Sequence, residues 1–250
     1  MKNPIILCMF SILLLGCETD TKLTFENTSF KGGNCDTCAD IKVEVPRALD
    51  ELKIAKSINS VIDEEIIYTL KFDEEVEVST VDGAITSFDN SFQDMLAEFG
   101  PTSEPWEAKV NGKVTFENMN VVTIALENYT YTGGAHGYFS KVFLNFDRRL
   151  GKEIEIHELF DDQMGFLQLA ESKFRMIYEI PQAVNINATG FMFNKDTFHL
   201  PENLGYTENG IELHYNQYEV ASYADGPLKL VVSFDEAHHF LKKVYRAKSK

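Results

Sequence analysis

Three cysteines carry the most specific chemistry in this sequence. Cys17 directly follows Leu14-Leu15-Gly16, and small residues at such a position predict a cleavage site, after which the free thiol can accept a lipid. Cys35 and Cys38 lie three positions apart, in the sequence Cys-Asp-Thr-Cys. A pair at this spacing can form a disulfide, exchange disulfides in a redox enzyme, or supply two of the four ligands of a zinc ion.

The segment before Cys17 has the layout of a secretory leader. Lys2 precedes an apolar run from Pro4 to Leu15, and a positive residue followed by a short apolar region is what the secretion machinery recognises. The alternative is a transmembrane helix, but spanning a bilayer takes about 20 apolar residues. Leu14-Leu15-Gly16-Cys17 resembles the bacterial lipobox, which implies cleavage before Cys17 and acylation of its thiol. We therefore predict that residues 1–16 are a lipoprotein signal peptide. Acylated Cys17 would then anchor the protein to a membrane of the bacterial cell envelope, on its extracytoplasmic side.

The Cys35 and Cys38 pair is predicted to form a structural disulfide, because exported proteins fold in an oxidising compartment. A thioredoxin-type site needs a strand before the pair and a helix after it, whereas a glycine-containing stretch precedes this pair and an alternating, strand-like pattern follows it. A zinc site needs two further ligands, and no second Cys-x-x-Cys or suitably spaced histidine pair occurs. The acidic runs lack the spacing of a calcium loop. No metal and no cofactor are predicted.

Two tyrosine-rich segments are the candidates for ligand binding. In the first, Thr132 to Gly137 reads Thr-Gly-Gly-Ala-His-Gly between two strand-like stretches; its glycines allow backbone amides to approach a ligand, and the neighbouring tyrosines offer faces for a sugar ring. The second, Tyr215 to Gly226, combines aromatic rings with a carboxylate, which suits a carbohydrate or an arginine-rich surface. The candidate ligand-binding residues are Tyr131, Gly133, Gly134, His136, Tyr138, Tyr218, Tyr223 and Asp225.

Both segments also have a structural interpretation, which the sequence favours. The glycines can serve a tight loop that hydrogen bonds from His136 hold in place, and Tyr218 and Tyr223 can be packing residues. A third interpretation makes His136 the general base of a hydrolase or deacetylase that acts on cell-wall sugars. The sequence contains no G-x-S-x-G, H-E-x-x-H or P-loop motif, so the chain is not expected to be an enzyme.

Charge and composition limit the partners. The 250 residues carry a formal net charge of −16, and cleavage would remove Lys2, the leader's one charged residue, leaving −17. Such a chain repels nucleic acid and anionic membrane surfaces and attracts cations or a cationic protein. Plain solubility is the alternative explanation of the charge. The hydrophobic content of 44% argues for a well-folded chain with an ample core.

The apolar periodicity changes along the chain from helical to alternating. Three-to-four-residue steps predict helices over 49–70, 85–99 and 166–180, and a capping-box pattern at Ser233 starts another that runs through Val244. Alternation predicts strands over 41–46, 121–131, 138–146, 154–156 and 211–215, and a continuous apolar run predicts one over 228–234. Asn111-Gly112 predicts a tight hairpin between strands at 106–110 and 113–117. The polar residues 18–34 are expected to be a tether.

Helices interleaved with hairpins predict an α+β fold of antiparallel sheets with packed helices, in two small subdomains. The expected order is a signal peptide over 1–16, then acylated Cys17 and a tether with the Cys-x-x-Cys pair over 17–40. A smaller N-terminal α+β domain over 41–125 and a C-terminal α+β domain over 126–250 follow.

Three stretches resemble one family. They are YTYTGGAHG at Tyr129 to Gly137, LNFDRRLGKEIEIHELF at Leu144 to Phe160, and IELHYNQYEVASYADG at Ile211 to Gly226. Together they resemble the domain-of-unknown-function family 3298, found in the extracellular part of RsiV-type lysozyme-sensing anti-sigma factors and PdaC-type peptidoglycan deacetylases. The region before them is similar to the smaller domain of the 4163 type that usually precedes it. The resemblance implies an extracellular recognition module.

From these observations we expect a cell-envelope lipoprotein whose extracytoplasmic domains bind lysozyme or a peptidoglycan-derived glycan. Lysozymes are often cationic, so the charge of the chain would attract them. Two alternatives remain open: an accessory protein of a cell-wall hydrolase or deacetylase, and a structural envelope protein. The expected partners are therefore a cationic protein or a cell-wall glycan, with the membrane contacted through the lipid and no nucleic acid.

Overall fold

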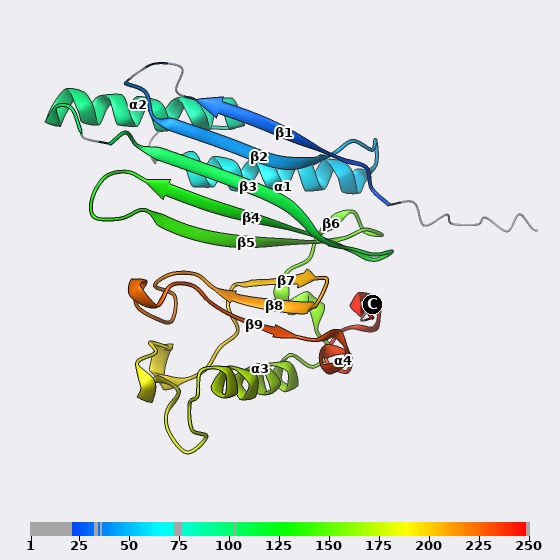
Figure 1. Ribbon diagram of the computed structural model, residues 1–250. Helices are drawn as coiled ribbons and strands as arrows, with labels where there is room; N and C mark the ends of the chain where they lie inside the picture. The colour runs from blue at the N-terminus through cyan, green and yellow to red at the C-terminus, as the bar shows by residue number, and fades with distance from the viewer. Residues whose placement is uncertain (1–21, 33–34, 36, 73–76, 103, 249–250) are drawn as a thin grey trace, which may run out of the picture.

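The computed structural model describes residues 22–32, 35, 37–72, 77–102 and 104–248, so Cys17 and the predicted leader lie outside the described residues. These residues form two β-sheets and four α-helices, with the strands of the larger sheet all preceding those of the smaller one along the chain (Figure 1). Both helices and strands contribute to each half, which confirms the predicted α+β class. In the described part of the chain, no helix is both long enough and apolar enough to cross a membrane.

The larger sheet contains six strands in sequence order: β1 (Phe25–Gly32), β2 (Asp40–Ala48), β3 (Glu107–Glu117), β4 (Val121–Tyr131), β5 (Tyr138–Asp147) and β6 (Lys152–Glu153). Every neighbouring pair is antiparallel except β2 and β3. These two strands are parallel because α1 (Lys53–Leu70) and α2 (Val81–Phe99) connect them and cover one face of the sheet (Figure 1). A parallel pair requires such a crossover.

The two helices form where the apolar periodicity predicted them. Ile58, Ile62 and Ile66 of α1 are fully buried against the sheet. Helix α2 begins four residues earlier than predicted, because Thr80 caps it by accepting a hydrogen bond from the Gly83 amide at 3.1 Å. It ends as predicted at Gly100, whose φ of 83° lies in the left-handed region.

The second sheet contains β7 (Asn203–Thr207), β8 (Gly210–Tyr215) and β9 (Leu228–Val232), all antiparallel. Helix α3 (Gln163–Ile177) packs against it, with Ala170 and Phe174 fully buried in the same core as the strands. The short helix α4 is Phe234–Ala237. Single 3-10 turns lie at Ile156–Leu159, Ile186–Thr189, Asn194–Asp196, Tyr223–Asp225 and Lys243–Tyr245.

The two sheets are packed against each other through β4 and β5. Residues of β4 alternate: Ile124 belongs to the core beneath α1 and α2, whereas Thr123 points to the opposite face. On that face Thr123 donates to Asn145 Oδ1 at 2.8 Å, and Asn145 Nδ2 donates to the Leu204 carbonyl of β7 at 2.7 Å. Polar groups therefore link the larger sheet to the smaller one in a buried layer.

Two glycines, one in this layer and one in β3, lie where neighbouring side chains leave no room for a Cβ atom. A Cβ atom on Gly205 of β7 would lie 2.2 Å from the Phe143 side chain. A Cβ atom on Gly112 of β3 would lie 2.8 Å from both the Leu126 and Pro46 side chains. Gly112 is paired with Leu126 within the part of the ladder that runs without a shift from Glu107 to Val114, so the hairpin predicted at Asn111-Gly112 is wrong. The glycine is needed there for space and not for a turn.

Other predicted elements also differ from the structure. The predicted tether is wrong over Phe25–Gly32, which forms β1 and pairs with β2 along its whole length. The strand expected at 154–156 is instead β6 at Lys152–Glu153. The last helix has only four residues, although its capping box at Ser233 is present. The expected division between residues 125 and 126 falls inside β4.

Candidate binding surface

A hollow lies beside Tyr138, the first residue of β5, and the segment from Asn216 to Glu219 that follows β8. We call it the tyrosine hollow. Its volume is about 540 Å³. Tyr138 and Tyr218 supply aromatic rings, with 42% and 56% of each residue exposed. Carboxylates and amides surround them. The lining residues are Tyr138, His199, Leu200, Glu202, Asn203, Asn216, Gln217, Tyr218 and Glu219.

Side-chain amides hold the two walls of the tyrosine hollow together. The free edge of β5 lacks a partner strand over this stretch, and its backbone groups are satisfied by the segment after β8. The Lys141 amide donates to Asn216 Oδ1 at 2.8 Å, and Asn216 Nδ2 donates back to the Lys141 carbonyl at 3.1 Å. The Phe139 amide donates to Gln217 Oε1 at 3.1 Å. Asn216 thus imitates a strand peptide group, which closes an exposed edge and fixes the position of Tyr218.

The hollow is acidic and partly desolvated. Desolvation, together with the Glu202 carboxylate, raises the pKa of Glu219, although a hydrogen bond from the Asn216 amide opposes the rise. Desolvation also raises the pKa of Tyr138, and the neighbouring Glu219 and Tyr68 add to this effect. Tyr68 is 82% exposed on α1 and is not among the residues that line the hollow. The predicted set of residues did not include Tyr68, which belongs to no tyrosine-rich segment.

The structure brings the two predicted tyrosine-rich segments together beside the hollow. The His136 ring stacks on Tyr223 with 3.7 Å between ring centroids and 18° between planes. Tyr223 donates its hydroxyl to the Gly137 carbonyl at 3.1 Å. The Tyr223 ring lies 5.6 Å from that of Tyr218. Three rings from two distant segments therefore form a continuous row that ends at the tyrosine hollow.

The glycines of the first segment shape its loop. Gly133 and Gly134 have φ values of 97° and 90°, which L residues rarely adopt, and a Cβ atom on either would meet no neighbour. Tyr131 donates its hydroxyl to the Gly134 carbonyl at 3.3 Å. Nδ1 of His136 lies 3.1 Å from the Gly137 carbonyl oxygen. These contacts belong to a tight loop, and His136 remains exposed at its tip.

The remaining candidate residues lie apart from the tyrosine hollow. Tyr131 and Tyr129 line another small hollow of about 380 Å³ together with Asp40 and Glu107, so the two tyrosines share a face as alternation predicts. The Asp225 carboxylate accepts hydrogen bonds from the Ser222 amide and hydroxyl in a capping box.

The Cys35 and Cys38 pair forms a disulfide before β2. It lies in the link between β1 and β2. The sequence separation of its two cysteines is three residues, so it closes a very short loop.

A second hollow lies beside the tyrosine hollow, farther along β5. We call it the β6 hollow, and its volume is about 480 Å³. Leu200 and Glu202 line both hollows and form a shared wall. Desolvation, together with the carboxylates of Glu155, Glu65 and Glu64, raises the pKa of Glu153 in this hollow to about 7. None of the candidate residues from the sequence lies here.

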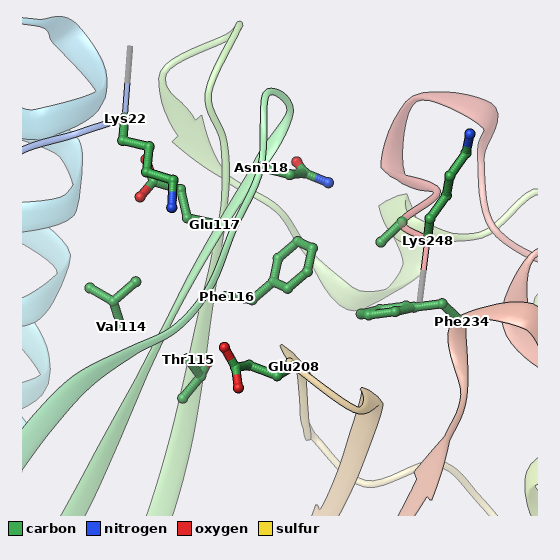
Figure 2. Close-up of a pocket in the computed structure, with 10 residues that line it drawn as sticks. Lys22, Val114, Thr115, Phe116, Glu117, Asn118, Glu208, Phe234 and Lys248 are labelled. Atoms are coloured by element: carbon green, nitrogen blue, oxygen red, sulfur yellow. The ribbon is translucent and has the colours of Figure 1, made fainter. Parts of the chain in front are cut away.

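Figure 2 shows a further hollow, of about 350 Å³, at the other end of β4. Its aromatic residues Phe116 and Phe234 pack on each other with centroids 5.4 Å apart, so they serve the core. Glu117 accepts a hydrogen bond from the Leu23 amide at 2.8 Å, which holds the segment just before β1 beside this hollow. Lys22 and Lys248 also line this hollow. In the part of the chain that the structure describes, no group of three His, Cys, Asp or Glu residues is arranged to hold a metal ion.

The architecture is that of an α+β protein in which a six-stranded sheet packs on a three-stranded one, and solved proteins share it. A DUF3298 family protein from Pseudomonas aeruginosa PAO1 superposes with a TM-score of 0.66 at 19% identity, over 92% of this chain and 99% of that one. A DUF3298 family member from Bacteroides fragilis NCTC 9343 superposes with a TM-score of 0.72 at 17% identity, over 91% of this chain and 98% of that one. These similarities establish the fold.

Two family models match the sequence itself. Residues 34–138 match the family described as deacetylase PdaC, and residues 158–235 match the protein of unknown function DUF3298. The chain therefore contains a PdaC-family domain followed by a DUF3298 domain, which confirms the resemblance to the DUF3298 family and to PdaC-type proteins. Residues 139–157, which contain β6 and all of β5 except Tyr138, lie between the two matched segments.

A curated relative covers part of the chain. The peptidoglycan-N-acetylmuramic acid deacetylase PdaC of Bacillus subtilis (strain 168) is 26% identical over 154 residues, which are 60% of this chain and 32% of that protein. The chain thus spans about a third of the length of the curated relative that it matches.

Proposed function

We propose that this chain is a cell-envelope lipoprotein that binds a peptidoglycan-derived glycan in the tyrosine hollow. The observation that carries the proposal is the composition of the hollow: exposed rings of Tyr138 and Tyr218 beside Asn203, Gln217 and Glu219. Sugar rings present apolar C–H faces and polar edges, so a site for them combines aromatic surfaces with a few polar groups. The relative in Bacillus subtilis is named for a peptidoglycan substrate, which supports a location and a ligand in the cell wall.

The anchor is part of the same proposal. Cys17 follows a leader-like segment, and acylation there would hold the protein on the extracytoplasmic side of a membrane. Mass spectrometry of the protein extracted from membranes tests this directly. An acylated N-terminal Cys17 is the expected result, and recovery of C17A in the soluble fraction would agree with it. An unmodified Cys17 with the leader still attached would contradict the anchor.

Binding without catalysis is proposed, because the sequence lacks the motifs of the common hydrolases. The packed rings of His136, Tyr223 and Tyr218 also support binding without catalysis. His136 is stacked on Tyr223, in the arrangement of a packed loop. A role as accessory protein to a cell-wall enzyme is compatible with glycan binding. If His136 were a general base, H136Q would abolish release of product from an acetylated glycan that the wild type processes.

Calorimetry with chito-oligosaccharides, which share the N-acetylglucosamine units of peptidoglycan, tests glycan binding. The chain from Asp20 to Lys250 is suitable because it retains every described residue. Y218A should weaken binding about tenfold, the loss expected for one stacked ring of about 1.4 kcal/mol. F99A is the matched control, since Phe99 is an aromatic residue exposed on α2, outside the described hollows. Heat that is absent with wild type, or equal for Y218A and wild type, would refute the proposal.

Lysozyme is a second candidate ligand, favoured by the net charge of −16 and by the carboxylates of Glu202 and Glu219 at the hollow. Attraction of this kind is screened by salt, because the Debye length falls from about 10 Å at 0.1 M to about 3 Å at 1 M. Lysozyme binding that disappears at high salt, and that E202Q weakens, would support the second candidate. Binding of uncharged oligosaccharides to the protein should be equally strong at low and high salt.

A further inference from the structure

We propose that the β6 hollow is a second subsite, so that the ligand is an extended glycan of four or more sugar units lying along β5. This inference rests on the proposed function, since it takes the tyrosine hollow as the first subsite. The two hollows share Leu200 and Glu202, so a chain that leaves one enters the other across a common wall. A mono- or disaccharide fills one hollow only.

The direction of the path follows from the strand that lines both hollows. Tyr138, the first residue of β5, lines the tyrosine hollow, and Phe143 and Asn145 of the same strand line the β6 hollow. Seven residues separate Tyr138 from Asn145, which is about 24 Å along a strand at about 3.4 Å per residue. Because seven is an odd number of steps, the two side chains lie on opposite faces of β5, so the hollows are connected through their shared residues Leu200 and Glu202. A single sugar unit is much shorter than this path. The site is therefore built for a polymer, which is the form of the glycan in a cell wall.

The β6 hollow has the chemistry of a sugar subsite. Ile154, Ile156 and Phe143 line it with apolar side chains; Ile154 and Phe143 are buried, so half-buried Ile156 is the one of the three that the C–H face of a sugar can contact. His157 and Gln163 stand exposed at the rim and offer hydrogen bonds to hydroxyl or acetamido groups.

Different elements of the fold hold the β6 hollow in place. Its apolar residues belong to β5 and to the turn after β6, while Gln163 is the first residue of α3. Asn145, in its wall, is buried and bonded to Thr123 and to the Leu204 carbonyl. The two subsites are thus fixed relative to each other by the same polar layer that joins the sheets.

The length dependence of affinity tests this inference. Chito-oligosaccharides of two to six units are titrated into the chain from Asp20 to Lys250. Wild type should bind the hexamer at least tenfold more tightly than the dimer. The H157A/Q163A variant should lose that gain while its affinity for the dimer stays unchanged. Y218A should weaken binding of both ligands, because it acts in the first subsite.

The control variant H239A/Q168A removes the same two side-chain types from exposed positions outside both hollows, and it should behave as wild type. Equal affinity for the dimer and the hexamer would overturn the second subsite and leave the proposed function standing. An equal loss for both ligands in H157A/Q163A would overturn it as well. Failure of every oligosaccharide to bind would instead refute the proposed function together with this extension of it.

Discussion

Replacing Glu212 by glutamine tests what holds the two sheets together. Glu212 Oε1 of β8 accepts a hydrogen bond from Lys141 Nζ of β5 at 2.8 Å, and both side chains are 12% exposed. His214 Nδ1 lies 3.5 Å from the same oxygen. The Lys141 ammonium also lies 4.5 Å from the centroid of the Phe143 ring. The substitution removes the carboxylate and leaves the ammonium in this poorly solvated place.

The expected loss is about 3 kcal/mol at neutral pH. Removing one partner of a buried ion pair costs about 3–5 kcal/mol, and the remaining exposure of this pair favours the lower end. The pKa of Glu212 gives a similar size. Desolvation opposes ionisation, but the neighbouring His214 and Lys141 outweigh it and lower the pKa from 4.5 to about 2. A difference of this size corresponds to about 3 kcal/mol of stability.

The pH dependence has a defined sign. A carboxyl group with a lowered pKa in the folded state stabilises the protein above its unfolded pKa of 4.5. That contribution is lost as the pH falls from 4.5 towards about 2. The difference in unfolding free energy between wild type and E212Q should therefore be about 3 kcal/mol near pH 7 and shrink strongly near pH 2. Urea unfolding followed by Trp106 fluorescence and by circular dichroism measures it.

Two further variants make the reasoning refutable. E51Q, in the exposed Lys56–Glu51 pair, should change stability by less than about 0.5 kcal/mol. In a double-mutant cycle, K141M/E212Q should lose less than the sum of the single variants, because the second change removes the unpaired ammonium. A loss below about 1 kcal/mol for E212Q at neutral pH, or an equal loss at both pH values, would show that the pair does not hold the sheets together.

Three other outcomes follow from the structure. G112A should lower stability by about 1–3 kcal/mol in urea unfolding, because its Cβ atom would overlap Leu126 and Pro46; an unchanged midpoint would contradict the close packing. Reduction of the Cys35–Cys38 disulfide should cost no more than about 2 kcal/mol, since the closed loop is very short, and mild reductant with thermal melting checks it. Glu153 has a pKa raised to about 7, so its ionisation should lower stability as the pH rises from 4.5 through 7. The effect should stay below about 1 kcal/mol because water reaches the side chain, and E153Q should remove it; an unaltered pH profile in E153Q would exclude this group as the source.

Periodicity predicted those elements whose burial follows one face. Ile58, Ile62 and Ile66 lie at four-residue steps and are all fully buried, so α1 was predictable. The apolar residues of β2, such as Ile41 and Val43, alternate and are buried in the same way. In such segments the residues that the local pattern assigns to the core are the ones that tertiary packing buries.

The errors occurred where a residue serves a distant contact. Gly112 provides space for Leu126 and Pro46, contacts that a two-residue hairpin signal does not report. Gly205 lies in the middle of β7 for the same reason, against Phe143, and this strand was not predicted. Strand β1 is polar because half of its residues are exposed at the sheet edge and none is fully buried, so composition alone resembled a tether.

The candidate site likewise combines residues that the sequence predicted with residues that it did not. Tyr138 and Tyr218 were recognisable from their aromatic, glycine-containing surroundings, and they meet in one hollow. Its other wall, which includes His199 and Glu202, comes from an irregular segment without a motif. Tyr68, which adds to the raised pKa of Tyr138, comes from the exposed face of a helix. Only the packing of the two sheets brings these parts together, and a single sequence carries no signal for that.

Strand β4 also holds the two ends of the larger sheet at a fixed distance from each other. The Leu23 amide is bonded to Glu117 just before its first residue, Val121, whereas Thr130 pairs with Tyr138 near its other end. Eleven residues span about 35 Å along a strand at about 3.4 Å per residue. An anchor at Cys17 would enter at the first end, so the tyrosine hollow would stand well above the lipid headgroups. With the proposed anchor and the proposed glycan site, the protein would reach polymer strands that pass over the membrane, while ligands confined to the headgroup layer would stay below its reach.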